Sequence, residues 1–420
     1  MRRTADPRRT FLLDLLEVAL VAVDGRRRMR AALSGAASRN TWVLAVGKAA
    51  SAMTLGVLDA LDAHVSRALV VSRAGHFDPE LERRPGIECI AAGHPLPDAA
   101  SLAAGESALA MAGAAPVGQR VILLVSGGAS SLFEAPAAGV SLDDLQRLNA
   151  WALGSGLDIE AVNGIRRRLS RVKDGRLLAA FAHCDVEAFF ISDVPGDDPA
   201  LVGSGLLAAS DRAPVEPAPL PGWVRDLLAR AQPPSAVARP VSVTCVGSLA
   251  EALAAVEQAA RAGGVAVHRH PTRLAGDAMA TARRVCEELA MSPEGVHVYG
   301  GETTVVLPQD PGRGGRNQHL ALAAACQLAG REDLVLLASA TDGSDGNTAD
   351  AGALVDGATI ERGREAGLDA QQCLARADSG RFLEAAGDLV HTGPTGTNVG
   401  DLVIAVRREP RHSPLPPLSM

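Results

Sequence analysis

The chain has 420 residues, of which 47% are hydrophobic and 21% are charged, and its formal net charge is −7. This composition argues against an intrinsically disordered chain, and the length exceeds what one compact core usually holds. The acidic balance argues against a general nucleic-acid surface, because phosphate backbones are bound by clustered positive charge. We therefore expect a globular protein of two domains.

The cysteine and hydropathy patterns limit the cellular setting. Six cysteines are scattered along the chain with no CxxC pair. This usage indicates neither a disulfide framework nor a zinc site, and it fits a reducing compartment. No apolar run approaches the ~18 consecutive residues of a membrane span. We expect a cytoplasmic protein that has no membrane or nucleic-acid partner.

The first predicted element is a helix close to the N-terminus. The sequence RRTFLL at 8–13 is similar to the start of an export signal, but Asp14 and Glu17 interrupt its apolar stretch. Apolar residues recur at helical spacing between Leu12 and Val23, which places them on one face. The pattern predicts an amphipathic helix.

Further along, short apolar runs alternate with Ala- and Leu-rich helical stretches. The runs are TWVLAVG from residue 41, RALVVS from 67, VILLVSGG from 121 and EAFFISDV from 187. Each is followed by a turn and a segment with helical character. This alternation predicts βαβ units around a mainly parallel sheet with flanking helices, an α/β fold.

Proline concentrates in residues 211–240 around one short helical piece, so this stretch is predicted to be a linker. The strand pattern restarts with VSVTCVGS at 241 and continues to DLVIAV at 401–406. We therefore expect an N-terminal domain over 1–240, a second α/β domain over 241–407 and a Pro-rich tail over 408–420.

Lysine is scarce. It occurs only at Lys48 and Lys173, among 41 basic residues. If arginine has replaced lysine wherever it would serve, a surviving lysine indicates a need for a compact ammonium group. Lys48 lies where a predicted strand ends in a glycine turn and a helix begins, at the carboxyl edge of the sheet. Lys48 is a candidate phosphate contact, and the alternative is a surface lysine without a ligand. This alternative has more weight for Lys173 than for Lys48.

A second strand, turn and helix pattern covers VILLVSGGASSL. Gly127 and Gly128 would leave backbone N–H groups open to an anion, and the hydroxyls of Ser126 and Ser130 can donate hydrogen bonds to it. A purely structural turn is the alternative.

Two acidic turns close predicted strands, ISDVPGDDP from residue 191 and ATDGSDGNTADAG from residue 340. They supply Asp193, Asp342 and Asp345. Magnesium takes one or two carboxylates together with substrate phosphates, so these residues are candidate metal ligands. Aspartate and glycine also form turns and helix caps, which is the structural alternative.

Three further polar segments supply candidate binding residues. PGRGGRNQH from 311 and GPTGTNVGD from 393 are Gly-rich, and NGIRRRLSRVKDGRL from 163 is basic. Arg316 can grip a phosphate or carboxylate with two parallel hydrogen bonds. The other candidates for substrate or phosphate binding are Asn163, Arg167, Lys173, Asn317, Thr395 and Asn398. No GxxxxGK[ST] is present, which excludes a P-loop kinase, and a GxGxxA at 203–208 follows a polar loop instead of a strand.

In their order along the chain, these segments resemble the glycerate 2-kinase family, whose C-terminal half is called the MOFRL domain. The matching pieces include VGKAASAM, GHPLPDAAS, LLVSGGASSL, ISDVPGDDP, YGGETTV, GGRNQ, TDGSDGNTADAGALVD and GPTGTNVGDL, between about residues 42 and 404. The resemblance implies an N-terminal Rossmann-like domain, a smaller C-terminal α/β domain with its MOFRL core at about 296–405, and an active site in the cleft between them.

The resemblance also implies an activity. It is the magnesium-dependent transfer of the γ-phosphoryl group of ATP to the 2-hydroxyl of D-glycerate, which gives 2-phosphoglycerate and ADP. The resemblance implies catalytic roles for Lys48 and Arg316, and we add Asp193 as a catalytic candidate. A hydroxypyruvate reductase and a non-catalytic sugar-acid or nucleotide-binding protein remain the alternatives. The assembly state is left open, with a homodimer as one possibility.

Overall fold

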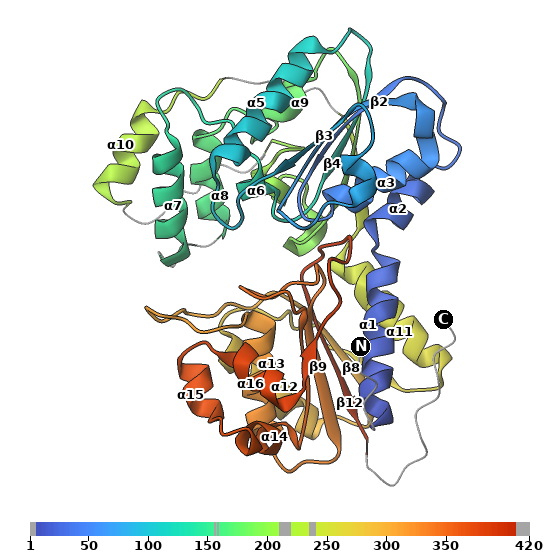
Figure 1. Cartoon of the computed structure of the whole chain (residues 1–420), viewed down its shortest axis with the longest axis vertical. Coiled ribbons are helices and arrows are strands. Elements are labelled where there is room, and N and C mark those ends of the chain that lie inside the picture. Colours follow the sequence, from blue (N-terminus) through green and yellow to red (C-terminus); the bar gives the residue numbers. More distant parts are fainter. Residues whose placement is uncertain (1–5, 155–156, 158, 210–219, 235–240, 409–420) are drawn as a thin grey trace. The chain divides into compact units, whose positions relative to one another are not determined.

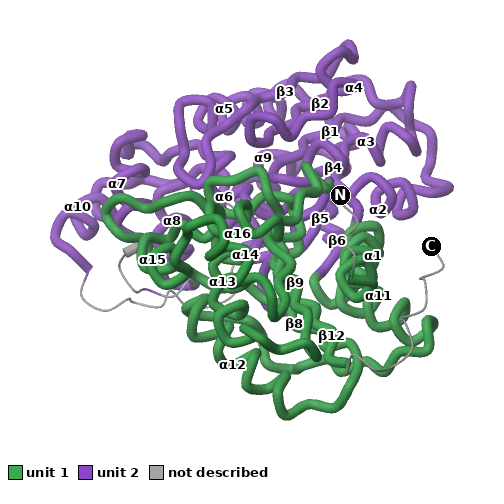
Figure 2. The backbone as a smooth tube through the Cα atoms, turned by 60° about the horizontal axis from the view of Figure 1, so that its bottom comes forward, with its two compact units in different colours: residues 1–23, 249–395, 399–420 green, residues 24–248, 396–398 purple. Residues whose placement is uncertain are grey.

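The computed structural model describes residues 6–154, 157, 159–209, 220–234 and 241–408, and these form two compact units (Figure 2). Unit 2 contains residues 24–248 and 396–398, and unit 1 contains residues 1–23, 249–395 and 399–420. The two-domain α/β expectation is confirmed. The expected division at residue 240 differs from this arrangement, because the first 23 residues belong with the C-terminal half of the chain.

Unit 2 is built on a six-stranded sheet in which every neighbouring pair is parallel. Its strand order is β3-β2-β1-β4-β5-β6, which is the order of the Rossmann fold. The strands are β1 (Thr41–Val46), β2 (Val65–Ser72), β3 (Ile87–Ala91), β4 (Arg120–Val125), β5 (Asp185–Ile191) and β6 (Ser242–Gly247). The run from residue 241, predicted to open the second domain, is thus the edge strand of the first sheet, because it pairs with β5.

Helices cover both faces of this sheet (Figure 1), so β4 is buried along its whole length and β1 at every residue except Trp42. One face is covered by α2 (Gly25–Ala32) and α3 (Ala50–Leu61); the other is covered by α5 (Ala99–Ala114), α6 (Ala129–Leu132) and α9 (Arg176–Ala180). The remaining elements are η1 (Asp62–His64), α4 (Pro79–Glu82), α7 (Leu142–Gly154), α8 (Ile159–Arg168), η2 (Pro195–Asp197), η3 (Val202–Ser204) and α10 (Gly222–Arg230).

The predicted linker contains a packed helix. Val224 and Leu227 on the buried face of α10 share a hydrophobic cluster with Leu145 and Leu148 of α7. This part of the stretch therefore adds to a core instead of only joining two domains. Residues 211–219 and 235–240 of the predicted linker, and residues 409–420 of the predicted tail, lie outside the described residues.

Unit 1 has a second six-stranded sheet, in the order β11-β10-β9-β12-β8-β7. Only β7 and β8 pair in parallel; the other four pairs are antiparallel. The strands are β7 (Val267–Arg269), β8 (Gly295–Gly301), β9 (Leu334–Ala340), β10 (Gly352–Asp356), β11 (Leu389–Val390) and β12 (Asp401–Arg407). Because the directions alternate, the ends of β8 and β9 and the start of β12 lie at one edge.

The predicted first helix is α1 (Pro7–Ala22), and it packs in unit 1. It lies with α11 (Leu249–Ala262) on one face of the second sheet, and α12 (Ala278–Met291) and α13 (Arg316–Leu328) lie on the other (Figure 1). The remaining helices are α14 (Thr359–Glu365), α15 (Ala370–Ala375) and α16 (Ser379–Ala386). Within the described part of the chain, no helix has the length and apolar character needed to span a bilayer.

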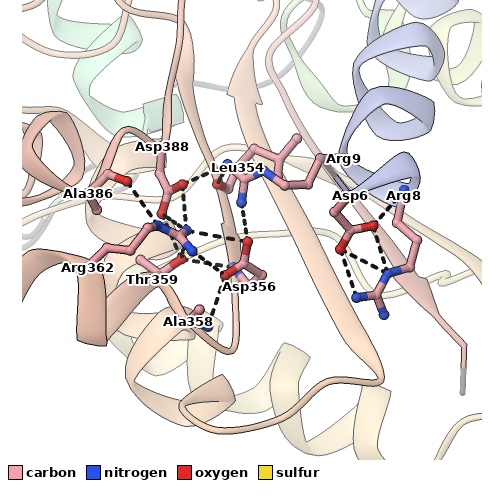
Figure 3. A network of polar contacts seen from close by, with 10 residues as sticks. All are labelled: Asp6, Arg8, Arg9, Leu354, Asp356, Ala358, Thr359, Arg362, Ala386 and Asp388. Carbon is pink, nitrogen blue, oxygen red and sulfur yellow. Dashed lines mark hydrogen bonds and ion pairs between the residues drawn. The ribbon is translucent and has the colours of Figure 1, made fainter. Parts of the chain in front are cut away.

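A buried ionic network joins α1 to the rest of unit 1 (Figure 3). Arg9 donates to Asp388 Oδ1 at 2.7 Å and to the carbonyl oxygen of Leu354 at 2.9 Å, and it also pairs with Asp356. Arg362 bonds the same two carboxylates, at 3.0 Å to Asp356 and 2.7 Å to Asp388. Arg9 is 6% exposed and Asp388 is 2% exposed, so each charge depends on its partners.

We expect the substitution Arg9→Met to destabilise unit 1 by about 3–5 kcal/mol, because it leaves a buried carboxylate partly uncompensated. Urea unfolding followed by circular dichroism measures this loss. The control is Arg261→Met, which removes an exposed i,i+4 pair with Glu257 and should cost at most about 0.5 kcal/mol. Equal effects of the two substitutions would show that α1 is held by apolar packing alone.

Candidate functional site

Lys48 lies at the point in unit 2 where the strand order reverses, between β1 and β4. The helices that follow these strands cover opposite faces of the sheet, and open α/β sheets bind their ligands at the carboxyl ends of the strands at such a point. The Lys48 N–H donates to the Gly127 carbonyl at 3.0 Å, and the Ala49 N–H donates to Ser126 Oγ at 3.0 Å. Lys48 is partly exposed, and these two hydrogen bonds hold its turn against the turn at Ser126 and Gly127.

Ser126, which the sequence predicts to bind an anion, has another role in the structure. Its side chain is 0% exposed, and its hydroxyl oxygen accepts the Ala49 N–H. A Cβ at Gly47 would lie 2.3 Å from this oxygen, so only glycine fits before Lys48. Ser126 therefore joins the two turns and is not placed to bind substrate.

The Gly127–Gly128 turn is closely surrounded by polar side chains. A Cβ at Gly127 would lie 2.0 Å from both Asp193 Oδ2 and Asn398 Nδ2, and Asn398 donates to Asp193 at 3.4 Å. Gly128 has φ +85°, and a Cβ there would lie 3.2 Å from Lys48 Cγ. The structure thus brings together Lys48, both glycines and Asp193, which the sequence predicts at the ends of strands of the first sheet. Asn398, predicted in the second domain, joins them because residues 396–398 belong to unit 2.

The same turn borders a residue that the sequence analysis did not select. His94 Nε2 would lie 3.4 Å from a Cβ at Gly128. His94 is part of GHPLPDAAS, a segment that carries the family resemblance, but no neighbouring residue signals chemistry there. Its place beside the turn depends on the fold.

For the kinase activity that the resemblance implies, we expect Gly127→Ala to lower kcat/KM by about a hundredfold, because the methyl group must displace Asp193 and Asn398 from the turn. The backbone itself tolerates alanine, since Gly127 has no left-handed φ. Steady-state kinetics measure the loss. Gly113→Ala in α5 is the matched control, because its added Cβ meets nothing within 4 Å. An unchanged kcat/KM for Gly127→Ala would show that this turn has no part in catalysis.

Lys173 and Arg167, both predicted to bind substrate, are buried in the scaffold of unit 2. Lys173 is 1% exposed; it pairs with Glu134 and donates to the Ser130 carbonyl at 2.9 Å. Burial lowers the pKa of Lys173, and the nearby Glu134 carboxylate opposes that shift. Arg167 donates to the Ala200 carbonyl at 2.7 Å. These contacts indicate structural roles, and the burial of Lys173 also contradicts the surface position that the sequence analysis gave as its alternative.

Unit 1 carries a second polar group at one edge of its sheet. Arg316 begins α13 and binds Asp401, the first residue of β12, at 2.6 Å and 2.9 Å. Its Nη1 also pairs with Glu302, which follows β8, at 3.0 Å. Burial opposes the charge of Arg316, but Asp401 outweighs it and raises the pKa of the guanidinium. Within the described residues, carboxylates engage three of its five N–H groups.

Asp345, a predicted metal ligand, caps helix α13. Its Oδ1 accepts the Asn317 N–H at 3.1 Å, and its Oδ2 accepts the Gln318 N–H at 2.8 Å. Burial raises the pKa of Asp345 to about 7, which is far above the usual range of a carboxyl group. Asn317 is only 1% exposed and its amide group also faces Asp345, at 3.3 Å. Both residues therefore serve the start of the helix, which for Asp345 is the structural alternative stated above.

Two further candidates in unit 1 are tied to neighbouring turns. Asp342 is 4% exposed and accepts the Ser344 N–H at 2.9 Å. The Thr395 hydroxyl donates to the Thr341 carbonyl. Over the described part of the chain, no three His, Cys, Asp or Glu side chains are grouped so that they could hold a metal ion. A magnesium ion held mainly by substrate phosphates needs only one or two of them.

Comparison with known proteins places this geometry in a family. Residues 11–218 match a domain of unknown function, DUF4147, and residues 295–401 match the MOFRL family. A D-glycerate 2-kinase of Thermotoga maritima is 32% identical over 416 residues, which cover 94% of this chain and 97% of that protein. A putative hydroxypyruvate reductase of Agrobacterium vitis is 36% identical, over 86% of this chain and 97% of that protein.

The fold agrees with this relationship. The crystal structure of a glycerate kinase from Thermotoga maritima matches with a TM-score of 0.79 and 30% identity, and the match covers 95% of this chain and 99% of that one. The similarity therefore extends over both units, and the chain belongs to the glycerate 2-kinase family.

Proposed function

We propose that this protein is an ATP-dependent D-glycerate 2-kinase, which transfers the γ-phosphoryl group of ATP to the 2-hydroxyl of D-glycerate. One observation supports the proposal above all: Lys48 is held over a Gly-Gly turn at the switch point of a Rossmann-type sheet. Open α/β sheets bind their ligands at such points. The name of the Thermotoga maritima relative provides the substrate and the position of transfer.

The proposed chemistry uses positioning and charge. Phosphoryl transfer spreads negative charge over the oxygens of the transferred group, so cations placed beforehand lower its barrier. Lys48 would neutralise part of this charge, and the two N–H groups of Arg316 that Asp401 and Glu302 leave open would bind a substrate anion. Asp193, beside the Gly127 turn, would accept the proton of the attacking hydroxyl.

Magnesium is the proposed cofactor, with ATP as co-substrate. It prefers hard oxygen ligands and keeps several positions for water and phosphate oxygens. The carboxylate of Asp193 or that of Asp342 has the required chemistry, whereas both oxygens of Asp345 are engaged by α13. When bound, the ion would neutralise charge on the nucleotide phosphates.

The test is incubation with ATP, magnesium and D-glycerate, followed by enzymatic discrimination of 2-phosphoglycerate from 3-phosphoglycerate. We expect ADP release that depends on D-glycerate, 2-phosphoglycerate as the product, and loss of activity when EDTA removes the magnesium. Formation of 3-phosphoglycerate would refute the position of transfer. The absence of ADP release would refute the kinase.

The name of the Agrobacterium vitis relative favours a second candidate, a hydroxypyruvate reductase. A Rossmann-type nicotinamide site usually carries its glycine fingerprint in the turn after β1. Here the GxGxxA sequence lies at Gly203, Gly205 and Ala208, in and after η3, far along the chain from β1. The disappearance of NADH absorbance with hydroxypyruvate would support the reductase, and an unchanged absorbance would exclude it. A non-catalytic binding protein would bind glycerate without either reaction.

We also propose a cytoplasmic location, because all six cysteines are free thiols, as a reducing compartment maintains. Cell fractionation tests this, and recovery from an oxidising compartment would contradict it.

The proposed partners of the protein are small molecules, glycerate and ATP. Light scattering would establish whether the protein forms the homodimer that the sequence analysis left open.

A further inference from the structure

Three polar side chains form a hydrogen-bonded chain in unit 2, and one of them lies on α6, which follows the glycine turn. Ser204 in η3 donates its hydroxyl hydrogen to Asn163 Oδ1 of α8 at 2.9 Å. Ser204 Oγ also lies 2.7 Å from Ser130 Oγ of α6. Ser204 is 1% exposed and Asn163 is 4% exposed, whereas Ser130 is partly exposed. Of the three residues, Ser130 is therefore the one with surface that a ligand could contact.

The position of Ser130 connects the chain to the proposed active site. Helix α6 begins directly after Gly128, whose Cβ position faces the Lys48 side chain. The Ser130 carbonyl accepts a hydrogen bond from the buried ammonium of Lys173 at 2.9 Å. The buried lysine thus fixes the backbone of α6 at Ser130, which gives the Ser130 hydroxyl a defined place.

The backbone at Ser204 supports a requirement for its hydroxyl group. Ser204 has φ +60° and lies between Gly203 with φ +58° and Gly205 with φ +85°. A left-handed conformation is unfavourable for a residue with a Cβ and is easy for glycine. Glycine would remove this strain at position 204, so the serine is retained at a conformational cost, and the hydroxyl is the group that glycine lacks.

The hydrogen bonds have only one consistent direction. A serine hydroxyl carries a single hydrogen, and an amide oxygen can only accept. Ser204 uses its hydrogen on Asn163, so the short contact between the two serines requires Ser130 to donate to Ser204. Ser130 Oγ then has only its lone pairs left for a further partner. Such a group repels carboxylate and phosphate oxygens and accepts a hydrogen bond from a hydroxyl.

We infer that Ser130, oriented by Ser204 and Asn163, accepts a hydrogen bond from the non-reacting 3-hydroxyl of glycerate and selects substrates that carry it. This inference rests on the proposed function and adds a specificity-determining residue to it. It replaces the sequence-based prediction that Ser130 donates to an anion, because the hydroxyl hydrogen is already used. Ser204 and Asn163 are positioning residues, since neither is accessible to substrate.

D-Lactate tests the inference, because it lacks only the 3-hydroxyl of D-glycerate. The dissociation constants of both acids are measured by isothermal titration calorimetry with magnesium and ADP present. We expect the wild-type protein to prefer D-glycerate by about tenfold, the effect of one hydrogen bond to a group that would otherwise be unpaired. In Ser130→Ala the preference should fall to about twofold or less, through weaker binding of D-glycerate and unchanged binding of D-lactate.

Two further variants separate this role from a general effect on folding. Ser204→Gly relieves the left-handed backbone and removes the acceptor for Ser130, so it should stay folded and lose the preference as Ser130→Ala does. Ser131→Ala is the matched control; it changes the next serine of α6, which donates to the Gly128 carbonyl at 3.3 Å, and should keep the wild-type preference.

Several outcomes would overturn the inference. An equal loss of affinity for both acids in Ser130→Ala would show that Ser130 contacts the carboxylate or the 2-hydroxyl that the two acids share. An unchanged preference in Ser130→Ala, or an unchanged preference in Ser204→Gly, would remove the hydroxyl chain from specificity. Turnover of D-glycerate in the same preparations tests the kinase separately, because the inference depends on a ratio of affinities.

Discussion

Replacing Lys48 with methionine is expected to lower kcat by about a thousandfold or more, with little change in stability. The methionine side chain has a similar length but no charge, so the transferred phosphoryl group loses a cation that acts mainly in the transition state. Lys48→Arg should recover little activity, because a planar guanidinium is wider than an ammonium and the Gly128 turn lies against the lysine stem. Initial rates at saturating ATP and thermal unfolding measure the two effects.

A surface variant provides the comparison for Lys48. Arg39→Met removes an exposed ion pair with Asp185 in the same unit and should leave both rate and stability nearly unchanged. Near-normal turnover by Lys48→Met would exclude Lys48 from the mechanism. If Lys48→Met unfolds at a temperature so low that most of the protein is unfolded during the assay, the lysine serves the fold instead.

The second large effect is expected for Arg316→Met. Asp401 is 1% exposed and forms two hydrogen bonds with Arg316, so the substitution leaves a buried carboxylate without its main partner. We expect a loss of about 3–5 kcal/mol in the stability of unit 1. Kinase activity should also fall, because the proposed anion contact disappears. Activity alone therefore does not identify the role of Arg316.

The double variant Arg316→Met with Asp401→Leu separates the two roles. Replacing a buried ion pair by apolar side chains is often neutral or stabilising, so most of the lost stability should return. If Arg316 binds a substrate anion, the rate stays low although the protein is stable again. Recovery of the rate together with the stability would show that the arginine serves only to hold Asp401.

The local parts of the candidate site could be predicted from the sequence. A strand, a glycine turn and a helix at residues 41–61 and 120–132 are signalled by composition and period, and parallel strands bring their carboxyl ends to one edge. This reasoning placed Lys48 beside Gly127, Gly128 and Asp193. The lysine scarcity selected two residues, but it could not tell the partly exposed Lys48 from the buried Lys173.

The chain by itself determined the first helix, several strands such as β1, β4 and β5, the α/β class and the family, because these depend on local patterns and on motifs in a set order. Tertiary structure alone decided which elements pack together. A hydrophobic face identifies a helix and not its partner, so the sequence could not show that α1 packs in unit 1 or that β6 completes the first sheet. Strand direction in the second sheet, the cap formed by Asp345 and the hydroxyl chain to Ser130 likewise arise from pairings between residues far apart in sequence, which periodicity does not encode.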